Sequence, residues 1–149
     1  FYATNSVHNT FLTTSEPYSL QFILGILNSK FMGYIYRTLS GETRDIFPQV
    51  HISMLEKLPI RMVNFDNPAE RQKHDEIVSL VGQIIELNLR LNCNVSQTPN
   101  NELSNRIQEI DDRIDREVYG LYDLNAEEIE LIESYWKDCS SDGQKATHK

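Results

Sequence analysis

The second half of the chain contains two apolar seams, and they constrain the fold more than any other feature. Their members recur at steps of three and four residues, which places one apolar stripe along a helix. The seam residues are Ile77, Leu80, Ile84, Leu87 and Leu91 in the first stretch, and Leu103, Ile107, Ile110, Ile114, Val118 and Leu121 in the second. A mainly polar break, residues 92–101, separates the seams. The pattern predicts an antiparallel helical hairpin of coiled-coil type, with helices over 69–91 and 102–121.

A further helix is predicted after the hairpin, over residues 126–138. Asn125 and Glu128 have the spacing of a capping box, in which each side chain accepts the backbone N–H of the other residue. Residues 140–149 are small and polar, and we expect a disordered tail there. Together with the hairpin, the terminal helix forms a predicted helical spacer over residues 64–139.

A largely buried helix is predicted near the start of the chain, over residues 17–39. Pro17 suits its first turn, and apolar residues recur along it at helical spacing. Gly25 and Gly33 each cost about 1 kcal/mol of helix propensity relative to alanine. We therefore expect these glycines to permit close backbone approach.

Short strands are predicted on both sides of this helix. Residues 6–14 mix β-branched and aromatic side chains, and residues 46–52 and 57–63 each contain a proline, which confines a strand to a sheet edge. A single helical turn is predicted between the latter two segments, at 53–56. The expected fold class is therefore α+β, with a small β-containing part over residues 1–63 packed on a helix, followed by the hairpin and the terminal helix.

Charge is distributed unevenly along the chain. Up to Met62 there are five basic and four acidic residues, a net charge of +1, and the remainder has nine basic and eighteen acidic residues, a net charge of -9. The near-neutral part could approach phosphates, whereas the acidic part suits contact with protein. The candidate phosphate-binding cations are Lys30, Arg37, Arg44, Lys57 and Arg61. Composition alone is equally consistent with an ordinary solvated surface.

Motifs of common catalytic and metal sites do not occur in the sequence. There is no GxSxG motif, no glycine-rich phosphate loop, no HExxH and no EF-hand pattern. Cys93 and Cys139 are too few for a disulfide framework or a CxxC zinc site. The charges of residues 109–117 alternate in sign, which is typical of a solvated helix flank rather than a metal site. We expect no catalytic residue, no metal and no cofactor in this chain, and surface positions for His74 and Asp75.

The most apolar stretch of the chain, residues 18–39, predicts a buried helix rather than a membrane span. Polar and charged residues interrupt it, including Asn28, Lys30 and Arg37, and no secretory signal is visible. The low cysteine content fits a reducing compartment, so we expect a cytoplasmic protein. The chain also begins in the middle of a pattern, and we expect it to be a piece of a longer protein.

Three strings resemble the TaqI-like C-terminal specificity domain, and in order they cover roughly residues 10–135. They are FILGILNSKF at 22–31, FPQVHISMLEKLPI at 47–60 and IDDRIDREVYGLYDL at 110–124. This family caps adenine-N6 DNA methyltransferases and type IIG restriction-modification enzymes, and it is similar in plan to the specificity subunits of type I systems.

The resemblance implies that residues 1–63 are the C-terminal portion of a DNA target-recognition domain. It also implies that the helical spacer docks on a catalytic methyltransferase domain. Double-stranded DNA would then be the ligand, with Thr43 and His51 as further candidates for polar contact. S-adenosylmethionine would serve the parent enzyme and not this chain, because the methyltransferase motif Asn-Pro-Pro-Tyr does not occur here. We expect most of the base-reading surface to precede Phe1.

A second class of function competes with this one. The seams alone also predict a plain protein-interaction module whose helical hairpin self-associates and which has no DNA-binding role. A tight dimer formed through the two seams would favour this alternative.

Overall fold

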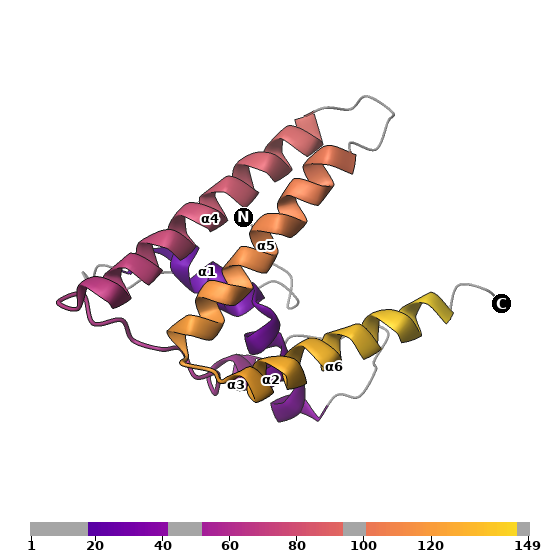
Figure 1. The fold of residues 1–149 in the computed structure, drawn as a ribbon, viewed down its shortest axis with the longest axis horizontal. Coiled ribbons are helices and arrows are strands. Elements are labelled where there is room, and N and C mark those ends of the chain that lie inside the picture. Colours follow the sequence, from indigo (N-terminus) through magenta and orange to yellow (C-terminus); the bar gives the residue numbers. More distant parts are fainter. Residues whose placement is uncertain (1–17, 42–51, 94–100, 146–149) are drawn as a thin grey trace.

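The structure, a computed structural model, describes residues 18–41, 52–93 and 101–145, and this part of the chain is all-helical (Figure 1). The helices are α1 (Leu20–Asn28), α2 (Lys30–Ser40), α3 (Ile52–Leu55), α4 (Pro68–Cys93), α5 (Asn101–Leu121) and α6 (Ala126–Lys145). No strand occurs among the described residues, so the predicted α+β class is wrong. The predicted strand over 6–14, and nearly all of the one over 46–52, lie outside the described residues.

The predicted hairpin helices are present as α4 and α5. Figure 1 shows the two helices side by side and antiparallel, and more residue pairs meet between them than between any other two helices. The seam residues nearest α1 are fully enclosed: Ile77 and Val118 are each 0% exposed. Burying such a side chain stabilises the fold by about 1.5–3 kcal/mol.

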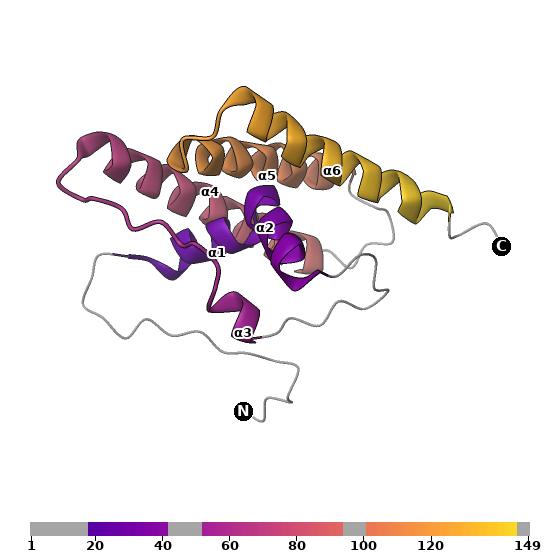
Figure 2. The same ribbon diagram turned by 90° about the horizontal axis from the view of Figure 1, so that it is seen from below.

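Helix α1 lies against the hairpin and completes its core. Phe22 and Ile26 of α1 are each 0% exposed, and they share one cluster with the seam residues of α4 and α5. Figure 2 shows α2 continuing from α1 beside α5, with α3 on the side of α2 away from α5. The two predicted parts of the chain therefore share a single hydrophobic core.

The predicted helix over 17–39 is two helices, and the expectation of one continuous helix is wrong. Ser29 interrupts it with an extended backbone, φ -67° and ψ 152°. The Ser29 hydroxyl donates to the Ile26 carbonyl at 2.7 Å and accepts the Met32 N–H at 3.2 Å. One buried serine thus ends α1 and begins α2, because its short side chain satisfies backbone groups of both helices.

The segment 57–63 forms no strand, so this part of the strand prediction is also wrong: residues 57 and 58 belong to the turn that follows α3, and residues 59–63 have no regular secondary structure. Tyrosine hydroxyls make the backbone hydrogen bonds that a neighbouring strand would otherwise make. The Tyr122 hydroxyl accepts the Arg61 N–H at 3.0 Å and donates to the Pro59 carbonyl at 2.7 Å. The Tyr18 hydroxyl likewise accepts the Val63 N–H at 3.0 Å and donates to the Val63 carbonyl at 3.2 Å. Side chains therefore satisfy the backbone that a sheet would otherwise satisfy.

Both glycines lie at close contacts, but the atoms that approach them belong to side chains rather than to another backbone. A Cβ atom at Gly25 would lie 2.7 Å from the Ile77 side chain, and one at Gly33 would lie 2.8 Å from the ring of Trp136. Gly25 lets α1 approach α4, whereas Gly33 lets α2 approach α6. The two glycines serve different contacts because the break at Ser29 places them on different helices.

Two local predictions near the ends of helices are also confirmed. The single turn between the two proline-containing segments is α3. The Asn125 N–H donates to Glu128 at 2.9 Å, and the Glu128 N–H donates to Asn125 at 3.0 Å, which is the predicted capping box. Helix α6 continues to Lys145, beyond its predicted end at residue 138, so the predicted disordered tail is wrong for residues 140–145.

Candidate functional site

Lys30, the first of the predicted phosphate-binding cations, lies among carboxylates from two other helices. Its Nζ atom is 3.4 Å from Asp112 and 3.3 Å from Asp115, both on α5, and 3.3 Å from Glu133 on α6. Burial lowers the pKa of Lys30, but the attraction of Asp115 and Glu133 outweighs this effect and raises the pKa above its usual value. Lys30 is therefore a charged anchor between α2, α5 and α6.

Asp115 is the most enclosed member of this group, at 6% exposure. It accepts the backbone N–H of Lys30 at 2.8 Å as well as pairing with the Lys30 side chain. Burial raises the pKa of Asp115, while its bonds to Lys30 act in the opposite direction. Nearby, the Tyr119 hydroxyl donates to Glu133 at 2.8 Å, and burial together with this bond raises the pKa of Tyr119. The group is a connected ionic network at the junction of three helices.

Arg37 also faces α6. Its guanidinium lies 5.0 Å from the ring centroid of Trp136, a cation–π geometry, and it donates to the Cys139 sulfur at 3.9 Å. The Trp136 indole N–H donates to the Lys30 carbonyl at 3.0 Å. The same tryptophan therefore contacts α2 at both Lys30 and Arg37.

Arg61 and Lys57 differ in their surroundings. Arg61 pairs with Asp123 at 2.7 Å, and this hydrogen bond raises the pKa of Arg61 and lowers that of Asp123. Lys57 follows α3, is exposed, and makes no ion pair with any other residue that the structure describes. Thr43, Arg44 and His51 lie outside the described residues.

The four described cations thus do not form one shared concave site. Lys30 and Arg37 contact α6, Arg61 contacts the turn between α5 and α6, and the side chain of Lys57 is exposed to solvent. Three of the four described cations are held by neighbouring side chains, which the sequence pattern did not indicate.

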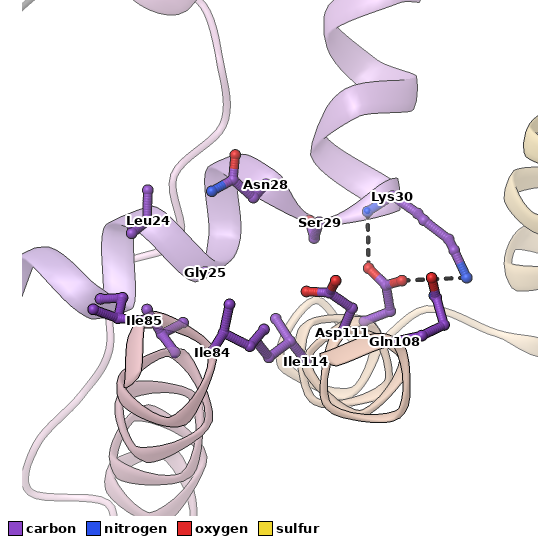
Figure 3. A pocket seen from close by; sticks show the side chains of 12 residues that line it. Leu24, Gly25, Asn28, Ser29, Lys30, Ile84, Ile85, Gln108, Asp111 and Ile114 are labelled. Atoms are coloured by element: carbon purple, nitrogen blue, oxygen red, sulfur yellow. Dashed lines mark hydrogen bonds and ion pairs between the residues drawn. The ribbon is translucent and has the colours of Figure 1, made fainter. Parts of the chain in front are cut away.

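A groove between α1, α4 and α5 was not predicted. It encloses about 390 Å³, and Figure 3 shows its side chains in close view. Leu24 of α1 and Ile85 of α4 line it, with Val81 and Ile114 deeper inside and Asp111 of α5 among its polar residues. Leu24 is 43% exposed, contrary to the expectation of a largely enclosed first helix. The heptad-like pattern gave no signal for the groove, because Leu24 and Asp111 belong to segments far apart in the sequence.

His74 is buried rather than at the surface, which corrects the expectation for this residue. It is 5% exposed and packs against the rings of Phe22 and Phe65, with centroid distances of 4.7 and 5.0 Å. Its Nδ1 atom is 2.9 Å from Asp75, whereas its buried Nε2 atom has no hydrogen-bond partner among the described residues. Its neighbours on α1 and after residue 63 are aromatic, so its place in the structure is a core position.

The described ranges contain neither a metal-ligand cluster nor a membrane-spanning helix. No group of three or more histidine, cysteine, aspartate or glutamate side chains there has the arrangement of a metal site. Among the helices that the structure describes, none combines the length and the apolar content that crossing a membrane requires.

Comparison with known protein families matches the first part of the chain. Residues 1–60 match the TaqI-like C-terminal specificity domain, which confirms the resemblance expected from the strings at 22–31 and 47–60. The third string, at 110–124, lies outside the matched residues. Neither the curated proteins nor the solved structures contain a match to the chain.

Proposed function

We propose, from the match of residues 1–60 to the TaqI-like C-terminal specificity domain, that this chain takes part in DNA target selection by a restriction-modification system. A specificity domain is not itself catalytic, so the chemistry would belong to another part of the parent protein. The parent would be an adenine-N6 DNA methyltransferase or a type IIG restriction enzyme, and S-adenosylmethionine would be its cofactor. A cytoplasmic location stays a prediction.

The matched residues would lie toward DNA, and the later helices would lie toward protein. This proposal is supported by the charge difference between the two parts of the chain, +1 up to Met62 and -9 after it. A phosphate backbone repels the acidic helices and tolerates the near-neutral part. The later helices, from residue 64 on, would dock on the catalytic domain.

Lys57 is the strongest described candidate for a phosphate contact. It lies within the matched residues, and its ammonium is free of ion pairs with the other described residues. Arg44, with Thr43 and His51, stays a candidate from the sequence alone. Lys30, Arg37 and Arg61 would contribute less, because a phosphate contact would have to compete with their present partners.

The alternative of a self-associating hairpin is not favoured. The seam residues that would form a dimer core, such as Ile77, Ile110 and Val118, are at most 2% exposed within the single chain. A dimer through the same seams would have to displace α1 from the hairpin.

A DNA titration over a series of salt concentrations tests the proposed function. Fluorescence anisotropy would follow a labelled duplex with the unmodified chain, Lys57→Ala and Arg44→Ala, and with Lys137→Ala as a control on α6. Each lost phosphate contact should weaken binding and lower the salt slope by about 0.9. The control should bind as the unmodified chain does. No DNA binding by the unmodified chain, or equal slopes for all variants, would contradict the phosphate contacts.

A further inference from the structure

The groove between α1, α4 and α5 combines exposed apolar side chains with a buried apolar floor. Leu24 is 43% exposed and Ile85 is 42% exposed, whereas Val81 and Ile114 beneath them are 4% and 5% exposed. Leu89, one turn beyond Ile85 on α4, is 59% exposed. Leaving three large aliphatic side chains in water along neighbouring helix faces has a cost in free energy, which a docked apolar side chain would remove.

The polar residue that distinguishes this groove from an ordinary apolar patch is Asp111. Its carboxylate makes no hydrogen bond or ion pair with another described residue. The nearest cation of the groove is Lys30, and that ammonium is held by Asp115 and Glu133. Figure 3 shows Asp111 on α5 beside Ile114, across the groove from Asn28 of α1.

The electrostatic surroundings of Asp111 favour a cationic group. Asp111 is an exposed residue, yet partial burial of its carboxylate, followed by the negative charge of Asp112, raises its pKa, while Lys30 acts in the opposite direction. An approaching ammonium or guanidinium would oppose this rise in pKa, because its charge stabilises the ionised carboxylate. A ligand that fits this groove would therefore carry an apolar group next to a positive charge.

Charge also discriminates between classes of occupant. Helices α4, α5 and α6 lie in the part of the chain whose net charge is -9, so DNA and a second copy of the same acidic surface would both be repelled. A basic, amphipathic partner would be attracted.

We propose that this groove binds an amphipathic helix of the parent enzyme's catalytic domain, which inserts an aliphatic side chain between Leu24 and Ile85 and places a lysine or arginine beside Asp111. Grooves between helices commonly accept such helices through side chains spaced three, four and seven positions apart. The proposal rests on the docking part of the proposed function and identifies the surface that does the docking.

A designed peptide pair is the probe. Each peptide has about 18 residues, long enough for appreciable helicity, with leucines at i and i+4 and either arginine or glutamate at i+7. Binding to the full 149-residue chain would be measured by isothermal titration calorimetry, and methyl NMR would locate the contact. The arginine peptide should shift the methyl signals of Leu24, Ile85 and Ile114, and the glutamate peptide should bind about tenfold more weakly.

Variants of the chain test the two requirements separately. Ile85→Glu should weaken the arginine peptide by at least about tenfold, and Asp111→Asn should remove most of the difference between the two peptides. Leu131→Glu on α6 is the matched control, since Leu131 is 55% exposed and lies outside the groove lining, and it should change nothing. Circular dichroism would verify that each variant is folded.

Specific results would overturn this assignment. They are no binding of either peptide, equal binding of both peptides, methyl shifts on α6 in place of the groove, or a dimer of the chain that Ile85→Glu dissociates. The DNA titration of the same samples separates the two proposals. DNA binding without peptide binding contradicts the groove, whereas peptide binding without DNA binding contradicts the DNA role.

Discussion

The carboxylate of Asp115 on α5 holds both the backbone amide and the side-chain ammonium of Lys30 on α2. The amide lies 2.8 Å from one carboxylate oxygen, and the ammonium lies 3.3 Å from the other. This pair fixes the start of α2 against α5 across 85 residues of sequence. It also explains why a basic residue in the matched part of the chain is a structural anchor.

Removing this carboxylate should destabilise the fold. Asp115→Ala takes away the helix-capping acceptor and one of three carboxylates around Lys30, and we expect a loss of about 2 kcal/mol in the free energy of unfolding. Urea denaturation followed by circular dichroism measures it. Asp112→Ala is the control and should cost less than about 1 kcal/mol, because the Asp112 side chain is 44% exposed. Equal losses of stability in the two variants would contradict the argument that Asp115 is the main anchor of Lys30.

Asp111 should lower stability at neutral pH. Because its pKa is raised in the folded state, the folded state holds more protons than the unfolded state between the ordinary value of 3.8 and the raised value. Its contribution to stability therefore falls as pH rises through this window. Asp111→Asn should unfold at higher urea than the unmodified chain at neutral pH, and the difference should vanish below 3.8.

Asp123 provides a comparison of opposite sign. Arg61 lowers its pKa, so its contribution to stability is present above the ordinary value of 3.8 and is lost as pH falls through the lowered value. Asp123→Asn should therefore unfold at lower urea at neutral pH. Changes of the same sign in both variants would show that the pH argument is wrong.

Gly25 and Gly82 should respond oppositely to alanine. A Cβ atom at Gly25 would lie 2.7 Å from Ile77 and 3.0 Å from Val81, so Gly25→Ala should cost about 1–3 kcal/mol despite its better helix propensity. At Gly82 a Cβ atom meets nothing within 4 Å, and Gly82→Ala should stabilise the chain by about 0.5–1 kcal/mol. Thermal unfolding compares them, and a stabilising Gly25→Ala would refute the close approach of α1 to α4.

The two tyrosine hydroxyls that bond the backbone of residues 59–63 should each contribute to stability. Tyr18→Phe and Tyr122→Phe remove a group that both donates to and accepts from the backbone, and we expect a loss of about 1–2 kcal/mol for each. Hydrogen exchange of the Arg61 and Val63 amides should quicken, in the Tyr122 and Tyr18 variants respectively. If each variant exposed both amides equally, the segment would be held as one unit and not by separate hydroxyls.

His74 should tolerate an apolar ring better than truncation. His74→Phe removes the unpartnered Nε2 atom and keeps the packing against Phe22 and Phe65, so its urea midpoint should equal or exceed that of the unmodified chain. His74→Ala opens a cavity and should cost about 2–4 kcal/mol. A large loss of stability in His74→Phe would instead show that the hydrogen bond between His74 and Asp75 matters. Asp75→Ala should then lower the urea midpoint by a similar amount.

The long helices could be predicted from the sequence because their signals are local. The seam of α4 repeats within one helix, and Asn125 with Glu128 forms a complete cap by itself. The matched family was also identifiable from short strings, of which FILGILNSKF at 22–31 and FPQVHISMLEKLPI at 47–60 fall within the matched residues.

Tertiary structure alone decided how the early part of the chain is held. Asp115 accepts the backbone N–H that follows the helix break at Ser29, and the hydroxyl of Tyr122 accepts the backbone N–H of Arg61. The strand prediction was wrong because a side chain from a distant part of the chain, and not a second strand, satisfies this backbone. The sequence also gave no indication of which charges are paired: Lys30 is held by carboxylates, whereas Asp111 makes no hydrogen bond or ion pair with another described residue. Periodicity along a chain reports which face of a helix is apolar, whereas hydrogen bonds and ion pairs between distant residues depend on where the packed helices bring those residues together.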